Sequence, residues 1–404
     1  MVIIMKTAGI IAEYNPFHNG HAFQIDRTRQ AGATHIAAVM SGCFTQRGEP
    51  AIMPKPARCE AALLCGADLV VELPLPWALA SAETFAFGAV YILNALGCVD
   101  YLSFGSECGD TAALRRIAWL TAQIDGSPEL ASALATGVSF PRAREFALAG
   151  IAPEEDLKLL KNPNDMLAVE YLKALKRLNS PITPVAIRRQ SAGHDSLKTE
   201  DGFASASYIR RLLVEGRLEE ALSFVPERAA NIYRREFEKG CAPFLNAVAE
   251  PVILSQLRRL RVEDLANLPD VCEGLENRIF SAISLSTGLD ELMFRIKTKR
   301  YTLSRIRRII SAAFLGLSRD YTRNPPPYIR VLGFNPRGAE ILGAAKKSGV
   351  LSIVTRRADI CKMGSDAQRI YDLECLCSDL YGLCLPIRQP RGSEQRYKPL
   401  IIKS

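Results

Sequence analysis

The chain has 404 residues, of which 48% are hydrophobic and 23% are charged, and its formal net charge is +8. This length allows two or three domains, and the composition is that of an ordinary globular protein. No window approaches the roughly 18 uninterrupted apolar residues of a membrane span. No basic segment or cleavage site marks a signal peptide, so membrane-spanning and secreted classes are excluded and a cytoplasmic protein without a membrane partner is expected. The eleven cysteines include no Cys-x-x-Cys pair, which favours reduced thiols over disulfides or a zinc ribbon.

Short apolar runs alternate with helical patterns in the first half of the chain. Strands are expected at Thr7–Ala12, His35–Met40, Leu69–Leu73, Tyr101–Gly105 and Pro184–Arg188. Helices are expected at Gly20–Ala31, Lys55–Cys65, Ala82–Leu96, Thr111–Thr121 and Asp165–Leu178, with a helical insertion between residues 125 and 165. This alternation predicts an α/β fold with a Rossmann-like parallel sheet.

The motif His18-Asn19-Gly20-His21 follows the first expected strand and the turn at Asn15-Pro16. A strand, a turn and a helix N-terminus in succession present backbone N–H groups and a positive dipole end to an anion. The two imidazoles lie on one face of a helix turn, where they can donate hydrogen bonds to phosphoryl oxygens in a transition state. We interpret the motif as the His-x-Gly-His signature of nucleotidyltransferases, which act at the α-phosphate of ATP.

The two histidines have two other interpretations. A zinc site needs a third ligand, which would have to be the distant His35 or His194, and the metalloprotease pattern His-Glu-x-x-His is absent. The pair could also be ordinary surface or core histidines. The position directly after the first strand, where doubly wound folds bind phosphate, favours nucleotide over metal, and no metal site is predicted.

A loop over residues 40–50 follows the second expected strand and lies on the ligand side of a parallel sheet. Ser41, Gln46 and Arg47 could reach a substrate there, or belong to a solvated turn. Arg58 opens the next helix and either contacts phosphate or is solvated. Later in the chain, Asn164 or Asp165 is the expected N-cap of a periodic helix.

A second anion-binding site is predicted at Ser205, Ser207 and Arg210, where hydroxyls and a guanidinium stand at the start of a helix. The alternative is plain helix capping, but the upstream histidine motif favours phosphate binding. Arg188 and Arg189 close the fifth expected strand. Adjacent strand residues point to opposite faces, so at most one should face the ligand unless the strand has ended.

The region from about Leu218 to Asp320 has an almost wholly helical pattern and contains a basic stripe without any acidic residue. The stripe is interleaved with Phe294 and Tyr301, which fits RNA backbone binding better than a solvated helix face. Its seven cations are Arg295, Lys297, Lys299, Arg300, Arg305, Arg307 and Arg308.

A proline-rich linker at residues 324–327 leads to a small βαβ-like unit over Ile329–Thr355, which is expected to pack on the helical region. The polar segment Gln389–Ser404 is expected to be mobile. These patterns predict a nucleotidyltransferase domain at 1–216, a basic helical tRNA-binding domain at 217–324, and a small C-terminal α/β region at 325–404.

The combined motifs resemble the tRNA(Met) cytidine acetate ligase family, within the His-x-Gly-His nucleotidyltransferase superfamily. The likeness covers essentially the whole chain. It rests on Glu-Tyr-Asn-Pro-Phe-His-Asn-Gly-His from Glu13, Met-Ser-Gly-x-Phe-x-Gln-Arg-Gly-Glu-Pro from Met40, Glu-Leu-Pro from Glu72, Phe-Gly-Ser-Glu from Phe104, Pro163-Asn164, Ile187-Arg188-Arg189, Ser205-x-Ser207-x-Ile209-Arg210 and the Lys-Thr-Lys-Arg-Tyr stretch ending at Tyr301. The resemblance implies a ligase that converts acetate and ATP to acetyl-adenylate, then acetylates N4 of the wobble cytidine of elongator tRNA(Met).

The resemblance also implies an ATP site, with a Mg²⁺ ion assisting. Its residues are Ile11, Ala12, Glu13, Tyr14, Asn15, Pro16, Phe17, His18, Asn19, Gly20, His21, Ala22, Phe23, Gln24, Gly105, Asn164, Arg188 and Arg189. Two alternatives stay open on the residues alone. One is an adenylyltransferase acting on a phosphorylated coenzyme precursor, and the other is a non-catalytic RNA-binding protein.

Overall fold

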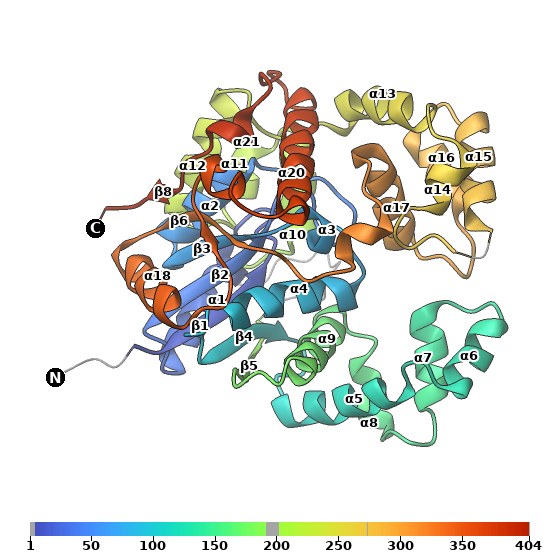
Figure 1. Cartoon of the computed structure of the whole chain (residues 1–404), viewed down its shortest axis with the longest axis horizontal. Coiled ribbons are helices and arrows are strands. Elements are labelled where there is room, and N and C mark those ends of the chain that lie inside the picture. Colours follow the sequence, from blue (N-terminus) through green and yellow to red (C-terminus); the bar gives the residue numbers. More distant parts are fainter. Residues whose placement is uncertain (1–4, 191–201, 273, 404) are drawn as a thin grey trace.

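A computed structural model describes residues 5–190, 202–272 and 274–403 of the chain. Its centre is one sheet with the strand order β5-β4-β1-β2-β3-β6-β7, and β8 pairs with β6 (Figure 1). The strands are β1 Thr7–Ala12, β2 His35–Ser41, β3 Leu69–Leu73, β4 Tyr101–Ser106, β5 Thr183–Arg188, β6 Ile329–Phe334, β7 Ile353–Val354 and β8 Leu400–Ile401.

The first five strands are parallel, as the alternating pattern predicts, and β1 lies between β2 and β4. Because the carboxyl ends of parallel strands meet at one edge, the loops that follow β1, β2, β4 and β5 converge there. β6 runs antiparallel to β3, with Glu72 opposite Arg330. The sheet is therefore mixed at this side, although its N-terminal part is Rossmann-like.

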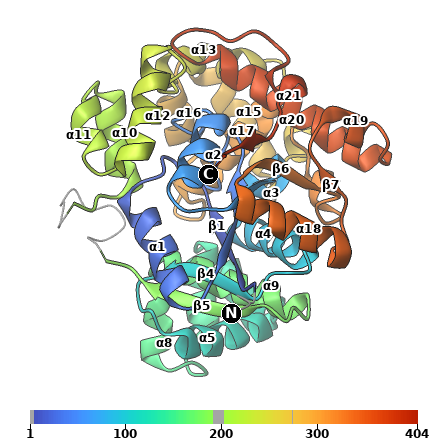
Figure 2. The same ribbon diagram turned by 90° about the vertical axis from the view of Figure 1, so that its left-hand side faces the viewer.

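Helices cover both faces of the sheet, and each face has its own hydrophobic core. One face is covered by α1 Asn19–Gln30, α2 Lys55–Leu64, α10 Ala206–Val214, α11 Leu218–Leu222 and α12 Glu227–Glu238. The other is covered by α3 Leu75–Ala78, α4 Ala82–Ala95, α5 Thr111–Ile124, α9 Pro163–Arg177, α18 Pro336–Ser348, α19 Arg357–Ile360 and α20 Ser365–Leu383. Figure 2 shows α10–α12 beside α1, on the opposite side of the molecule from α18 and α19.

Two helical regions lie beside the sheet (Figure 1). The expected insertion contains α6 Pro128–Ala135, α7 Phe140–Leu148 and α8 Glu154–Leu159. The expected basic helical region contains α13 Asn246–Leu257, α14 Val262–Ala266, α15 Leu275–Leu285, α16 Leu289–Ile296, α17 Leu303–Leu315 and the 3-10 helix η1 Arg319–Thr322. A third hydrophobic core joins this region to Phe44 of the loop after β2, to Leu75 of α3 and to α20.

The C-terminal segment differs from the expectation in its position. The predicted βαβ unit forms from β6, α18 and β7, but β6 pairs with β3 of the main sheet, so the unit extends that sheet instead of packing mainly on the helical region. The backbone edge of β3 offers unpaired hydrogen-bonding groups, which β6 satisfies.

The expectation of a mobile polar segment over Gln389–Ser404 is also wrong for its described residues. Helix α21 Ser393–Arg396 and strand β8 form there, and Glu394 is only 3% exposed. The Glu394 carboxylate accepts hydrogen bonds from Lys55 at 2.8 Å and ion-pairs with Arg330 at 2.6 Å. A buried carboxylate needs such partners, and they fix the segment against the sheet.

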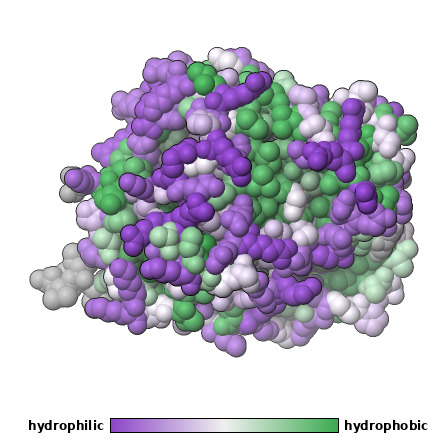
Figure 3. Space-filling model, turned by 45° about the horizontal axis from the view of Figure 1, so that its top comes forward, coloured by the Kyte–Doolittle hydropathy of each residue, from purple (hydrophilic) through white to green (hydrophobic). Residues whose placement is uncertain are grey.

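The face shown in Figure 3 is mostly hydrophilic, with a hydrophobic area near its middle. None of the helices in the described parts of the chain is long and apolar enough to cross a membrane.

Candidate functional site

The two histidines of the first motif close the N-terminus of α1. His18 is the N-cap residue, and its Nδ1 accepts a hydrogen bond from the Gly20 N–H at 3.0 Å. The His21 Nδ1 accepts from the His18 N–H at 3.2 Å. An imidazole nitrogen that accepts a hydrogen bond carries no proton, so both neutral rings have their proton on Nε2. Each ring therefore has one N–H donor left for a ligand.

Both imidazoles are kept neutral. Burial, helped by the positive charges of Arg189 and Arg210, lowers the pKa of His18 to about 3. Burial and the neighbouring His18 ring hold the pKa of His21 well below its ordinary value. The pair therefore offers neutral N–H donors to an incoming anion instead of full positive charges.

The sequence predicts that backbone N–H groups at the start of α1 face an anion, but the first two are bound to other protein groups. The Asn19 N–H donates to the Phe224 carbonyl at 2.9 Å, and the Gly20 N–H donates to the His18 ring. A Cβ on Gly20 would lie 2.8 Å from Cε1 of His18, so this position has no room for a larger residue. The imidazole Nε2–H groups and the helix dipole are thus what this motif offers to phosphate.

The second predicted motif lies next to the first. Ser205 caps α10 by accepting from the Tyr208 N–H at 3.2 Å, which confirms the helix start. Arg210 donates to the Asn15 carbonyl at 2.9 Å and to the Ser207 hydroxyl at 3.3 Å. The structure therefore brings the later motif to the turn that precedes His18, as binding of one triphosphate by both requires.

A pocket lies between the first motif and the ends of β4 and β5, and it reaches Ala204, the residue before Ser205, but Ser205, Ser207, Arg210 and His21 do not line it. It is lined by His18, Gly20, Phe23, Gln24, Gly105, Ile187, Arg188, Arg189, Gln190, Phe203 and Ala204. Seven of these residues belong to the ATP site that the resemblance implies. The site residues expected from the sequence do not include Ile187, Gln190, Phe203 and Ala204, although each lies within two positions of a motif residue. The Phe203 ring meets the Phe23 ring edge-on, with 6.0 Å between centroids.

Arg188 and Arg189 both line the pocket, because β5 ends at Arg188. The alternation of strand side chains therefore does not separate them. The Arg189 side chain crosses Gly105, where an added Cβ would lie 3.5 Å from its Cγ. This is an ordinary van der Waals distance, so the Arg189 side chain lies directly over the strand backbone at Gly105.

Asn164 is held near this edge by Glu107, a residue that the site prediction omitted. The Glu107 carboxylate accepts from the Asn164 side-chain amide at 2.6 Å and from the Asp165 N–H at 2.9 Å. The predicted N-cap is wrong, because Asn162 occupies that position. Asp165 instead turns back and accepts from the Glu107 N–H at 2.9 Å, so the two carboxylates fix β4 and α9 together.

Several residues of the implied ATP segment are buried supports. Tyr14 and Phe17 are 1% and 0% exposed and belong to the core beneath α1. The Asn15 side chain accepts from the Ile52 N–H at 2.7 Å, and the Glu13 carboxylate accepts from the Gln46 N–H at 2.9 Å. These side chains hold the turn and the next loop in place.

Arg58 has a structural role, contrary to both interpretations of its sequence position. It is fully buried and donates to the carbonyls of Glu13 at 2.7 Å, Ser41 at 3.1 Å and Met53 at 3.1 Å, and also to that of Gly42. One guanidinium therefore joins the end of β1 to the loop after β2.

The local sequence suggested a basic stripe without counter-charges, but the structure pairs several of its arginines with acidic residues. Arg295 pairs with Glu291 at 2.8 Å, and Arg308 pairs with Asp270 at 2.8 Å. Arg305 donates to the Asp270 carbonyl, while Arg307 pairs with Glu49 at 2.6 Å. All three acidic residues lie outside residues 295–308, and Asp270 and Glu49 are far away in the sequence, so the composition of the stripe alone does not reveal them.

The exposed lysines of the stripe directly follow α16. Lys297 and Lys299 are exposed, and within the described residues their ammonium groups form no ion pair or side-chain hydrogen bond. The neighbouring Phe294 is 81% exposed. Exposed cations beside an aromatic ring are suited to a nucleic acid backbone and its bases.

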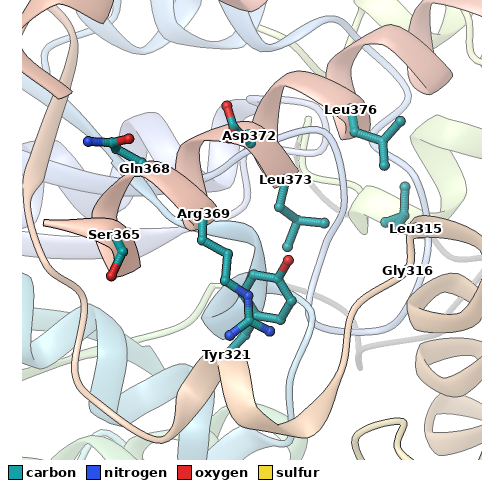
Figure 4. Close-up of a pocket in the computed structure, with 9 residues that line it drawn as sticks. All are labelled: Leu315, Gly316, Tyr321, Ser365, Gln368, Arg369, Asp372, Leu373 and Leu376. Carbon is teal, nitrogen blue, oxygen red and sulfur yellow. The ribbon is translucent and has the colours of Figure 1, made fainter. Parts of the chain in front are cut away.

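A larger pocket lies away from the histidines, between the end of α17, η1 and α20 (Figure 4). The Arg369 guanidinium lies over the Tyr321 ring, 3.9 Å from its centroid, and pairs with Asp320 at 2.6 Å. Arg369 is the one cation among the lining residues and Asp372 adds a negative charge, so this pocket lacks the set of donors that a triphosphate needs.

The described residues contain no group of three or more His, Cys, Asp or Glu side chains placed to hold a metal ion. His35 contacts Thr34 and Glu340, and His194 lies outside the described residues. Near the pocket, Glu13, Glu49 and Glu107 are all engaged by other protein groups. These residues do not fit a magnesium ion held by the protein alone.

A sheet whose first five strands are parallel, with a histidine pair at the first helix and a Ser-x-Ser-x-x-Arg motif beside it, is typical of a nucleotidyltransferase. The family model described as HIGH Nucleotidyl Transferase matches residues 5–396. The chain is 40% identical to the tRNA(Met) cytidine acetate ligase of Caldanaerobacter subterraneus subsp. tengcongensis, covering 94% of this chain and 95% of that protein. It is 38% identical to the enzyme of the same name from Acetivibrio thermocellus, covering 98% and 100%.

Solved structures agree with these matches. The apo crystal structure of Thermotoga maritima TmcAL superposes with a TM-score of 0.94 at 33% identity, covering 99% of this chain and 100% of that one. A second crystal form, bound with alpha-thio ATP, has a TM-score of 0.90 with the same identity and coverage. The chain belongs to the tRNA(Met) cytidine acetate ligase family of HIGH nucleotidyl transferases.

Proposed function

We propose that the protein is an ATP-dependent ligase that acetylates N4 of the wobble cytidine of elongator tRNA(Met) through an acetyl-adenylate. The observation that supports this most directly is the meeting of the His18–His21 pair and Arg210 around the Asn15 turn. Relatives of this name match nearly the whole chain, including the helical region, which a small-molecule adenylyltransferase has no evident need for.

The first step is adenylation of acetate. A carboxylate oxygen of acetate forms a bond to the α-phosphorus of ATP, while the bond from that phosphorus to the bridging oxygen breaks and pyrophosphate leaves. The Nε2–H groups of His18 and His21 donate to the phosphoryl oxygens on which charge accumulates. Ser205, Ser207 and Arg210 bind the departing pyrophosphate, with the helix dipole of α10 in support.

The second step needs no protein nucleophile, because acetyl-adenylate is already activated. The cytidine N4 attacks the acetyl carbonyl carbon, AMP leaves with the bonding electrons, and N4 loses a proton. We propose that Mg²⁺ arrives with the phosphates of ATP, since the nearby carboxylates are engaged. The Phe23 and Phe203 rings beside Gly105 offer apolar surfaces that suit a purine.

We propose that residues 217–324 bind tRNA, with residues 1–216 as the nucleotidyltransferase domain and 325–404 as the C-terminal α/β region. Within the stripe, Phe294, Lys297 and Lys299 are the most exposed candidates. All eleven cysteines are free thiols, which fits the cytoplasm, where tRNA is modified.

The test is mass spectrometry of elongator tRNA(Met) after incubation with the protein, ATP and isotopically labelled acetate. Labelled N4-acetylcytidine at the wobble position is expected, and omission of ATP or acetate should abolish it. Formation of labelled acetyl-adenylate without any labelled tRNA would contradict the RNA step and leave only carboxylate adenylation.

A further inference from the structure

Glu49 connects the ATP site to the basic helical region. Its Oε2 lies 3.2 Å from Nη2 of Arg210, and its Oε1 lies 2.6 Å from Nη1 of Arg307. Arg210 belongs to α10 and contacts the turn before the histidines, whereas Arg307 belongs to α17. One carboxylate thus joins two guanidinium groups from regions far apart in the sequence.

The loop that holds Glu49 is fixed on both sides. On the sheet side, the Gln46 N–H donates to Glu13 at 2.9 Å. On the other side, the Ser311 hydroxyl of α17 donates to the Gly48 carbonyl at 2.9 Å. Gly48 has a φ of +79°, and an added Cβ would lie 2.4 Å from the backbone nitrogen of Arg308, so the loop is pressed against α17.

The ion pairs of Glu49 with Arg210 and Arg307 are partly buried. The side chains of Glu49, Arg210 and Arg307 are 28%, 19% and 36% exposed, so they are screened less than a fully exposed pair. Arg210 is held by three acceptors, which are the Asn15 carbonyl, the Ser207 hydroxyl and Glu49. Because two guanidinium groups share one carboxylate, the cluster keeps excess positive charge for a phosphate.

We infer that Glu49 is a positioning residue that orients Arg210 for the triphosphate, and that Arg307 of α17 determines how strongly Glu49 holds Arg210. The inference rests on the proposed function, in which Arg210 binds the pyrophosphate part of ATP. While Arg307 shares the carboxylate, Arg210 stays available to phosphate. Without Arg307, Glu49 pairs with Arg210 alone and competes with ATP.

ATP binding measured without RNA distinguishes a role of Arg307 in the Glu49 ion pairs from RNA binding alone. An arginine that only contacts tRNA has no effect on ATP binding when RNA is absent. Arg307→Gln is expected to weaken ATP binding about fivefold to tenfold without RNA, which is the scale of coupling between residues in one ion-pair network. Arg307→Lys, which keeps a positive partner for Glu49, should restore most of the affinity.

The experiment is calorimetric titration of ATP into wild-type protein, Arg307→Gln, Glu49→Gln and the double variant, with thermal unfolding measured on each. In the Glu49→Gln background, Arg307→Gln should no longer change ATP affinity, since the carboxylate that transmits its effect is gone. Glu60→Gln is the matched control, because it removes another partly buried pair, to Arg235 at 2.6 Å, and should leave ATP affinity unchanged.

Wild-type affinity for ATP in Arg307→Gln would overturn the inference. An equal loss in both backgrounds would also overturn it, because a simple through-space charge effect of Arg307 does not need Glu49. Absence of ATP binding by the wild-type protein would overturn the proposed function as well, which keeps the two failures distinguishable.

Discussion

The imidazole ring of His18 lies against that of His21, with 3.9 Å between the ring centroids and 31° between the planes. Two charged imidazolium rings would repel each other at this distance, whereas two neutral rings pack well. Both Nδ1 atoms accept backbone N–H groups, which leaves both Nε2–H groups for a ligand. The close packing of the rings, the protons on Nε2 and the low pKa values are therefore mutually consistent, since all three belong to neutral imidazoles.

Nitrogen NMR of protein labelled on histidine should show this arrangement directly. At pH 6 and without ATP, two of the four histidines are expected to be neutral with the proton on Nε2, because burial disfavours the charged form. Substituting His18 should remove one of these two signals. Imidazolium shifts for all four histidines at pH 6 would contradict the account.

Stability should fall on acidification for the same reason. An unfolded His18 takes up a proton near pH 6.5, but the folded one does so only near pH 3, so its contribution is complete above pH 6.5 and is lost as the pH falls. Between pH 7 and pH 5 this one group should lower the free energy of unfolding by about 2 kcal/mol. Urea denaturation of wild-type protein and His18→Asn measures it, and an equal pH dependence in both would refute the assignment.

Arg58→Met should destabilise the protein and disorder the loop after β2. The substitution leaves the carbonyls of Glu13, Ser41 and Met53 without a buried donor, which costs at least about 2 kcal/mol. Urea denaturation measures the loss. A solvated or phosphate-binding arginine at this position would give unchanged stability, so that result would contradict its structural role.

Glu394→Gln tests whether the C-terminal segment is an integral part of the sheet. Burial opposes ionisation of Glu394, but Lys55 and Arg330 lower its pKa to about 2, so it is charged at neutral pH. Without this charge the two buried cations Lys55 and Arg330 share Glu72, so part of their positive charge is uncompensated and a loss of about 3 kcal/mol in unfolding free energy is expected.

The matched control for Glu394 lies in the same segment. Arg391 is 89% exposed in its pair with Asp379, so Arg391→Gln should change the unfolding free energy by less than about 0.5 kcal/mol. Equal, small effects of the two substitutions would show that the segment is not held as the structure has it.

Lys297→Gln combined with Lys299→Gln should weaken tRNA binding and lower its salt dependence. Each phosphate contact contributes about one unit to the slope of log affinity against log salt concentration, so the slope should fall by about two. Filter binding at several salt concentrations measures this. Arg308→Gln should act mainly on stability, because Arg308 is only 9% exposed and pairs with Asp270.

Local patterns predict much of the fold but not the long-range pairs. β1 and β3 have the predicted bounds, since short apolar runs between turns are local signals, and Ser205 begins its helix as its capping chemistry predicts. Glu49, the partner of Arg307, is 258 residues away in the sequence, so the local pattern of the basic stripe does not predict this ion pair. β8 has only two residues and depends on β6 for its existence, so polarity alone suggested a mobile end.

Acetate-dependent exchange of labelled pyrophosphate into ATP by wild-type protein and His18→Asn tests whether the histidine pair acts in the adenylation of acetate. Asparagine is a good N-cap, so this variant keeps the start of α1 while it loses the Nε2–H donor. Exchange that requires acetate is expected in the wild type, with a loss of about a hundredfold or more in the variant. Equal exchange by the two proteins, or wild-type exchange that does not need acetate, would contradict this role of the histidine pair.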